Sequence, residues 1–324
     1  MTQGVTGTTR LLPKGDARRS AFTLVELMVV ILIITLLASI ALVTMGGVAE
    51  KARADRTRSQ IARLHEMIME QWESYATRRM PPLGIPNATA KQNAAHRLLA
   101  LREWMRLELP DRITDVADHP GIIAAQGVSK APTAGPALWL AYNRRATQLT
   151  GPNWDRWTTE HQNAECLYLV ISRMQIGDSN GLKFFSDNEI GDVDEDGMPE
   201  ILDGWGNPMR FLRWAPGYFQ EPSLLPAEVA DKYRRTHDPF DPTNVDGVEA
   251  FQLIPVIYSL GPDGEDNILD DSTPLVRYAA TQKNSNSYPN YPYATFDLGL
   301  IGRVADVNKT THLDNLSNIF VPTK

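Results

Sequence analysis

The chain has 324 residues, of which 43% are hydrophobic and 22% are charged, and its net charge is -7. This balance is typical of a globular protein with a hydrophobic core. The negative charge gives no indication of a nucleic-acid-binding protein, so we expect no nucleic-acid partner. The single cysteine, Cys166, excludes an intrachain disulfide, and its apolar surroundings indicate a small buried residue rather than a nucleophile.

A basic N-terminal segment precedes a long apolar run. Residues 1–21 contain four basic residues and one acidic residue: Arg10, Lys14, Arg18, Arg19 and Asp16. From Leu27 to Met45 there is neither a charge nor a proline. A helix over this run would span roughly 29 Å at about 1.5 Å per residue, which is close to the hydrocarbon thickness of a bilayer. The run is longer than the apolar region of a signal peptide, about 7–15 residues, and it predicts one membrane-spanning helix. Basic residues flank it on both sides, so their distribution alone leaves the orientation open.

Glu26 lies directly before this apolar run. A carboxylate near the centre of a membrane costs about 2.5 kcal/mol or more without a partner, and less near the interface. On an isolated helix, the simplest interpretation is a solvated side chain in the headgroup layer.

The segment Arg18–Glu26, with the sequence RRSAFTLVE, resembles the processing site of type IV prepilins. In that family a basic leader stays in the cytoplasm, and prepilin peptidase cuts directly before a similar Phe-Thr-Leu-Val-Glu sequence. The resemblance implies cleavage between Ala21 and Phe22, followed by N-methylation of Phe22. Ala21 stands where the family nearly always has glycine, and the family's frequent mid-helix proline is missing.

The resemblance also implies polymerisation through the N-terminal helix. When subunits stack, Glu26 of one subunit can approach the α-amino group of Phe22 on its neighbour. A slip in register would leave the carboxylate unpaired, so we expect Glu26 to set the register. The implied partners are copies of the chain, other pilin-like subunits, prepilin peptidase and an inner-membrane assembly platform.

Beyond the apolar run, a helical stripe of apolar residues predicts that the helix continues to the prolines at 81 and 82. The stripe consists of Ile61, Leu64, Ile68, Trp72 and Tyr75. Further helices are predicted at 94–109, 136–149 and 158–174, and strands at 207–214 and 251–260. The expected fold is α+β and pilin-like, with a long N-terminal helix on an antiparallel sheet of about four strands and with helical and loop insertions.

The predicted domain organisation follows from these elements. The ranges are a cleaved cytoplasmic leader at 1–21, a transmembrane and assembly helix at 22–46, its amphipathic second half at 47–80, and a soluble domain at 81–324 with insertions at about 81–185 and 215–250. The predicted location is the inner membrane, with a single span and a periplasmic globular domain. After assembly the subunit would lie in a periplasmic or extracellular filament.

A first acidic loop has the spacing of an EF-hand calcium site. Carboxylates stand at loop positions 1, 3, 5, 9 and 12, with glycine at position 6: Asp192, Asp194, Asp196, Glu200, Asp203 and Gly197. The aspartate at position 12 is shorter than the usual glutamate, and Pro199 restricts the turn. The alternative interpretation is a solvated acidic loop.

A second acidic loop covers 259–271, and its composition alone indicates an acidic turn. Together with Asp203–Pro208, DGWGNP, it resembles the C-terminal half of the major pseudopilin of type II secretion. That resemblance implies a Ca²⁺ ion bound by the carbonyl of Leu260 and the carboxylates of Asp263, Asp270 and Asp271. The cation would provide the cross-link that one cysteine cannot form.

Three functions remain open from the sequence. The first is a structural subunit of a pseudopilus, similar to a type II secretion pseudopilin. The second is a surface type IV pilin or minor pilin whose enlarged domain is adhesive or binds a substrate. The third is a membrane-anchored hydrolase, but the sequence contains no nucleophile elbow, zincin helix, phosphate-binding loop or paired cysteines. We therefore predict no enzyme activity and no catalytic residue.

Overall fold

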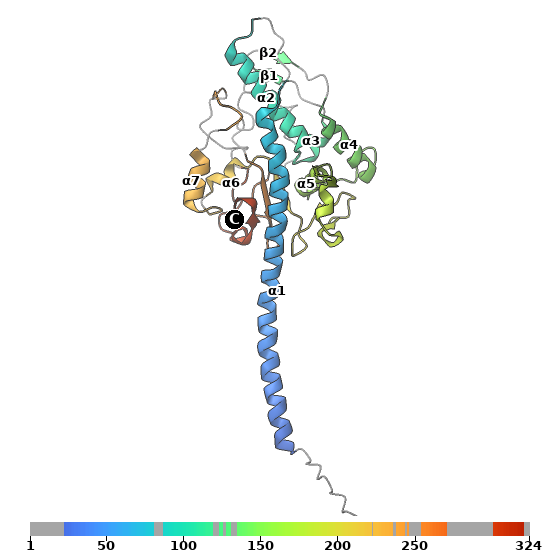
Figure 1. Ribbon diagram of the computed structural model, residues 1–324, viewed down its shortest axis with the longest axis vertical. Coiled ribbons are helices and arrows are strands. Elements are labelled where there is room, and N and C mark those ends of the chain that lie inside the picture. Colours follow the sequence, from blue (N-terminus) through green and yellow to red (C-terminus); the bar gives the residue numbers. More distant parts are fainter. Residues whose placement is uncertain are drawn as a thin grey trace, which may run out of the picture. The chain divides into compact units, whose positions relative to one another are not determined.

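The structure is a computed structural model of the chain. It describes residues 23–80, 87–118, 123–125, 128–130, 135–221, 223–235, 238–243, 245, 254–270 and 301–320. The chain divides into two compact units, Met1–Lys51 and Ala52–Lys324, and helix α1 has residues in both (Figure 1).

In the first unit, the described residues form the beginning of helix α1, Leu24–Ser74. Its large apolar side chains from Leu24 to Ile40 are 45–74% exposed. The side chains of residues 41–45 lie outside the described residues. Over the described part of the chain, no helix is both long enough and apolar enough to cross a membrane.

In the second unit, the predicted apolar stripe of α1 is confirmed as a packing face. Its members are 0–7% exposed and belong to the main hydrophobic core: Ile61, Leu64, Ile68, Trp72 and Tyr75. The α-helix ends at Ser74 and continues as a 3-10 turn, Tyr75–Thr77. This is earlier than predicted, and the prolines at 81 and 82 lie outside the described residues.

Three further helices lie where they were predicted, within a few residues at each end: α2 Ala90–Glu108, α4 Ala137–Thr150 and α5 Gln162–Ile171. The structure adds three shorter helices that were not predicted: α3 Ile113–Ala117, α6 Pro216–Gln220 and α7 Ala227–Arg235. Thr89 and Gln92 form a capping box that fixes the start of α2. Helices α6 and α7 lie next to each other within the predicted insertion 215–250 (Figure 1).

The strands are short and antiparallel. They are β1 Ile123–Ala125, β2 Val128–Lys130, β3 Gln175–Ile176, β4 Ser179–Asn180, β5 Ile190–Gly191, β6 Glu200–Ile201, β7 Arg210–Leu212, β8 Val256–Ser259 and β9 Leu316–Ser317. Pairs form between β1 and β2, β3 and β4, and β5 and β6, and the order β7-β8-β9 makes one sheet. The two predicted strands correspond to β7 and β8, which pair with Arg210 opposite Tyr258.

The main sheet has three described strands where about four were expected. Strand β6 approaches the start of β7 only through an isolated bridge between Leu202 and Pro208. Two hydrogen bonds flank this bridge, from the amide of Met209 to the carbonyl of Ile201 at 2.8 Å and from the amide of Asp203 to the carbonyl of Asn207 at 2.9 Å. The pair β5–β6 is otherwise separate from the sheet β7-β8-β9 in the described residues, and the fold is α+β as expected.

Helix α5 packs against β6 and β7, and all of its residues are buried. Cys166 on this helix is fully buried, as its apolar neighbours predicted, and burial raises the pKa of its thiol. The same helix carries Glu165, which is also fully buried.

Candidate functional site

The first candidate site is the start of helix α1. The Glu26 carboxylate accepts hydrogen bonds from the backbone amide and the hydroxyl of Thr23, at 3.0 and 3.1 Å. The amide of Glu26 in turn donates to the Thr23 hydroxyl at 3.1 Å. This reciprocal pattern is a capping box, so within one chain Glu26 satisfies donors at the start of its own helix. Ala21 and Phe22 lie outside the described residues.

Apolar side chains surround α1 directly after Glu26. Leu27, Met28 and Val29 are at least half exposed, and so are residues on the other faces, such as Leu32 and Leu36. A helix that is apolar on all sides is normally covered by protein or by lipid. The surface thus has the character expected of an assembly or membrane segment.

The second candidate site is a cluster of five carboxylates, which we call the acidic centre: Glu165, Asp192, Asp194, Asp196 and Glu200. Ligand oxygens of Glu165, Asp194 and Glu200 lie within 4.8 Å of one another, and so do those of Asp192, Asp194 and Asp196. Asp194 is common to both groups. The centre therefore joins helix α5 to the loop between β5 and β6.

The loop folds around the side chain of Asp192. Its two carboxylate oxygens accept hydrogen bonds from the amides of Asp196 and Gly197, at 3.1 and 3.0 Å. Gly197 has φ +99°, a conformation that favours glycine, and a Cβ there would lie 3.2 Å from the carbonyl oxygen of Leu149. These contacts turn the chain so that alternate acidic residues face one region.

Three carboxylates of the acidic centre share a pattern of hydrogen bonds. One oxygen of each is held by a donor: Glu165 by the indole of Trp157 at 2.6 Å, Asp194 by the hydroxyl of Thr158 at 2.7 Å, and Glu200 by the amide of Val193 at 3.1 Å. The other oxygen of each, Oε1 of Glu165, Oδ1 of Asp194 and Oε1 of Glu200, is buried and has no hydrogen-bond partner among the described residues. The set thus presents three buried acceptors with no donor.

The electrostatics of the acidic centre reflect this burial. Burial raises the pKa of Glu165 to about 10, and the negative charges of Asp196 and Asp194 add to the effect. Burial likewise raises the pKa of Glu200 to about 8, with further contributions from the loop aspartates. Without a cation, both groups therefore favour the neutral acid at pH 7.

Asp203, the expected twelfth residue of the EF-hand-type loop, has other contacts. Its carboxylate accepts hydrogen bonds from the amides of Trp205 and Asn207, at 2.8 and 2.9 Å, and from the hydroxyl of Ser259 at 2.6 Å. Asp203 belongs to neither group of converging ligand oxygens. It organises the turn 203–208 and joins that turn to strand β8.

Glu165 has no counterpart in the sequence-based prediction. It lies 27 positions before the loop in the printed sequence, so no spacing rule connects it with Asp192. The available signal was a carboxylate within the apolar segment 164–171, because a charged residue on a buried helix needs a partner.

The second acidic loop is described only up to residue 270, and Asp271 lies outside the described residues. Asp263 accepts a hydrogen bond from the amide of Glu265, and Asp270 accepts one from the side chain of Asn163 at 2.9 Å. Among the described residues, neither aspartate belongs to a group of three converging acidic, histidine or cysteine ligands. Burial raises the pKa of the nearby Asp314, with a further contribution from Asp263.

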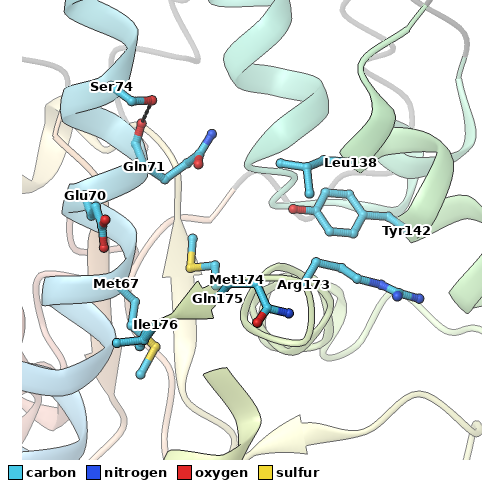
Figure 2. Close-up of a pocket in the computed structure, with 10 residues that line it drawn as sticks. All are labelled: Met67, Glu70, Gln71, Ser74, Leu138, Tyr142, Arg173, Met174, Gln175 and Ile176. Carbon is cyan, nitrogen blue, oxygen red and sulfur yellow. Dashed lines mark hydrogen bonds between the residues drawn. The ribbon is translucent and has the colours of Figure 1, made fainter. Parts of the chain in front are cut away.

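A pocket of about 350 Å³ lies between helices α1, α4 and the segment 173–176 (Figure 2). Its side chains are mixed in character: Met67, Glu70, Gln71, Ser74, Leu138, Tyr142, Arg173, Met174, Gln175 and Ile176. The hydroxyl of Ser74 donates to the carbonyl of Gln71 at 2.6 Å. The lining contains neither histidine nor cysteine, and we assign it no catalytic role.

Comparison with known proteins gives one match. The family model of the prokaryotic N-terminal methylation motif matches residues 16–42. The match includes Ala21, Phe22 and Glu26, and it confirms a prepilin-type N-terminal motif. No curated protein and no solved structure was found to match the chain.

Proposed function

We propose that this chain is a type IV pilin-like filament subunit, made as a prepilin and assembled through its N-terminal helix. The observation that carries the proposal is the N-terminal methylation motif at 16–42, which coincides with the exposed apolar start of α1. In this proposal, prepilin peptidase cuts between Ala21 and Phe22 and Phe22 is N-methylated. The mature helix then anchors the subunit in the inner membrane, with the globular domain in the periplasm, before polymerisation on an assembly platform.

Glu26 has a defined task in this proposal. Among the described residues of a single chain it accepts hydrogen bonds from Thr23 alone, and both residues are exposed, so these contacts are weak in water. In a bundle of apolar helices, the α-amino group of Phe22 on a neighbour would offer a charged donor in a low-dielectric setting. The carboxylate would then exchange its local partner for an intersubunit one, and only one register would satisfy it.

The test separates this register role from helix capping. Glu26→Val should leave the subunit inserted in the membrane but impair its assembly, whereas Thr23→Ala, which removes the capping side chain and keeps the carboxylate, should assemble. Filament yield from sheared or cross-linked cells measures assembly. Intact mass of the membrane-extracted chain should show a mature protein that begins with methyl-Phe22. Normal filaments from Glu26→Val, or a leader that is never removed, would contradict the proposal.

Within this class we favour a pseudopilin similar to the major pseudopilin of type II secretion. The support is the sequence of the turn 203–208 and of the loop 259–271. The alternative is a surface type IV pilin or minor pilin whose enlarged domain is adhesive or binds a substrate. Fractionation distinguishes the two, because long fibres shed from the cell surface favour the alternative.

A calcium-stabilised loop at 260–271 belongs to the same proposal. Supporting it, Oδ1 of Asp314 is buried without a hydrogen-bond partner among the described residues, and Gly261 lies against the backbone of Asp314. The proposed ligands are Leu260, Asp263, Asp270 and Asp271. Replacing both Asp270 and Asp271 by alanine should reduce the stabilisation of the chain by Ca²⁺. An unchanged response to Ca²⁺ in that double variant would contradict this part of the proposal.

A further inference from the structure

The acidic centre brings together two elements that are distant in the sequence. Glu165 comes from the fully buried helix α5, and the four other carboxylates come from residues 192–200. Glu165 and Glu200 are both completely buried, and Asp196 is 4% exposed. A solvated acidic loop, the alternative from the sequence, would not place carboxylates inside the core.

In the described part of the chain, the acidic centre lacks an ion pair with a lysine or arginine. Such pairs stabilise buried carboxylates elsewhere in the domain. An isolated ionised carboxylate in a protein interior is costly, and several facing one another repel. The centre therefore needs either protons or a cation.

The hydrogen bonds favour a cation. In each of Glu165, Asp194 and Glu200, a donor from a neighbouring residue holds one oxygen and leaves the other oxygen bare. Groups that orient ligands through their second atom in this way are characteristic of metal sites. All of the converging atoms are carboxylate oxygens, and a flexible set of hard oxygen ligands suits Ca²⁺, which takes six to eight.

We propose that the acidic centre binds one Ca²⁺ ion, with Glu165, Asp194 and Glu200 as its buried ligands and Asp192 and Asp196 completing the set. Glu165 takes the place that the EF-hand spacing assigned to Asp203. The ion ties α5 to the β5–β6 loop. Magnesium binds more weakly, because it demands a small octahedral shell and retains its waters. The site does not depend on filament assembly, so it stands or falls separately from the proposed function.

The first experiment measures thermal unfolding of the full chain in detergent, in a chelator and in CaCl₂. At free Ca²⁺ about 100 times the Kd of the acidic centre, binding at this centre should lower the unfolding equilibrium constant about 100-fold. Glu165→Gln and Asp194→Asn should lose this share of the response, whereas the Asp270→Ala, Asp271→Ala double variant should keep it. In the chelator, Glu165→Gln should unfold no earlier than the wild type, because it removes a buried acid without changing shape.

The matched control is Glu195→Gln. Glu195 belongs to the same loop and the change removes the same charge, but its side chain is exposed and lies in neither group of converging oxygens. This variant should respond to CaCl₂ like the wild type. An equal response of Glu165→Gln and Glu195→Gln would overturn the proposal.

The second experiment locates the ion. Tb³⁺ is a luminescent substitute for Ca²⁺, and Trp157, which contacts Glu165, is placed to sensitise it. Tb³⁺ emission excited through tryptophan should appear in the wild type and in the Asp270→Ala, Asp271→Ala double variant, and CaCl₂ should displace it. It should be lost in Asp194→Asn, whose side chain is half-buried and whose replacement keeps the volume. Emission that persists in Asp194→Asn but disappears in the double variant would place the ion in the loop 260–271 and refute the site proposed here.

Discussion

The backbone amide of Gly204 donates a hydrogen bond of 2.9 Å to the hydroxyl of Thr57 on helix α1. The same hydroxyl donates to the carbonyl of Arg53, one helical turn earlier, at 2.9 Å. A Cβ on residue 204 would overlap the Arg53 carbonyl and lie 2.9 Å from the Thr57 hydroxyl. The backbone of the turn 203–208 therefore lies directly against α1 at Gly204. Glycine is needed there because a side chain would not fit, and not because of its φ angle.

From this contact we predict that Gly204→Ala destabilises the globular domain by about 1–3 kcal/mol, the usual cost of forcing extra atoms into a packed site. Denaturant unfolding followed by tryptophan fluorescence measures the loss. Gly47→Ala is the control, because Gly47 is helical and a Cβ there would meet no atom within 4 Å. Equal midpoints for Gly204→Ala and the wild type would contradict the close approach.

Glu189 forms a second connection to α1. Its carboxylate accepts hydrogen bonds from Gln60 at 2.8 Å and Arg56 at 3.1 Å on the helix, and from the amide and hydroxyl of Ser186, both at 2.7 Å. Burial would raise its pKa, but the hydrogen bonds from Ser186 and the charge of Arg56 outweigh burial and lower it. A carboxyl with a lowered pKa in the folded state contributes stability at neutral pH, and this contribution is lost as the pH falls below the ordinary value for glutamate.

We therefore predict that Glu189→Gln lowers the free energy of unfolding by about 1–3 kcal/mol at pH 7, the cost of weakening a buried charged hydrogen bond. The gap between the wild type and the variant should narrow as the pH is lowered from 7 towards 3. Chemical unfolding of both proteins across this range measures the gap. A gap that stays constant with pH would show that the charge of Glu189 does not carry the effect.

The parts of the fold that the sequence predicted are those with a local pattern. The stripe from Ile61 to Tyr75 has helical spacing, and the apolar segments around Phe211 and Ile257 are bounded by turn residues. Each of these patterns depends only on residues that are close together in the sequence. The structure confirms all three segments as predicted.

The acidic centre needed information that no local pattern holds. Spacing placed Asp192, Asp194 and Asp196 together, because they alternate within one loop. It also selected Asp203, whose carboxylate instead accepts three hydrogen bonds within the turn 203–208 and from β8. Glu165 approaches the loop only because α5 packs on β6 and β7, a tertiary contact that single-sequence reasoning does not reach.

Arg213 forms the centre of a buried ionic network beside α3. It is 1% exposed, and its guanidinium donates to Asp115 at 2.7 Å and to the carbonyl of Leu109 at 3.0 Å, and lies 3.3 Å from Asp111. Burial alone would raise the pKa of Asp115, but Arg213 and Arg106 lower it to about 2. Without Arg213, buried carboxylates would lose their closest compensating charge.

We predict that Arg213→Met lowers the free energy of unfolding by about 3–5 kcal/mol at pH 7, because it removes the closest positive charge from two buried carboxylates, Asp115 and Asp111. The variant should also depend less on pH. In the wild type, the lowered pKa of Asp115 contributes stability that is lost as the pH falls towards that low pKa, whereas in the variant only Arg106 and Arg112 still oppose burial and this contribution shrinks. Calorimetric or denaturant unfolding at pH 7 and pH 4.5 should therefore show that the variant loses less unfolding free energy, relative to the wild type, at the lower pH.

Arg58→Ala serves as the control, since Arg58 and Asp55 form an exposed pair at 2.9 Å. Its effect on the free energy of unfolding should stay within about 1 kcal/mol at both pH values. A deficit for Arg213→Met no larger than that of Arg58→Ala would mean that packing, and not this charge network, holds α3 to the core.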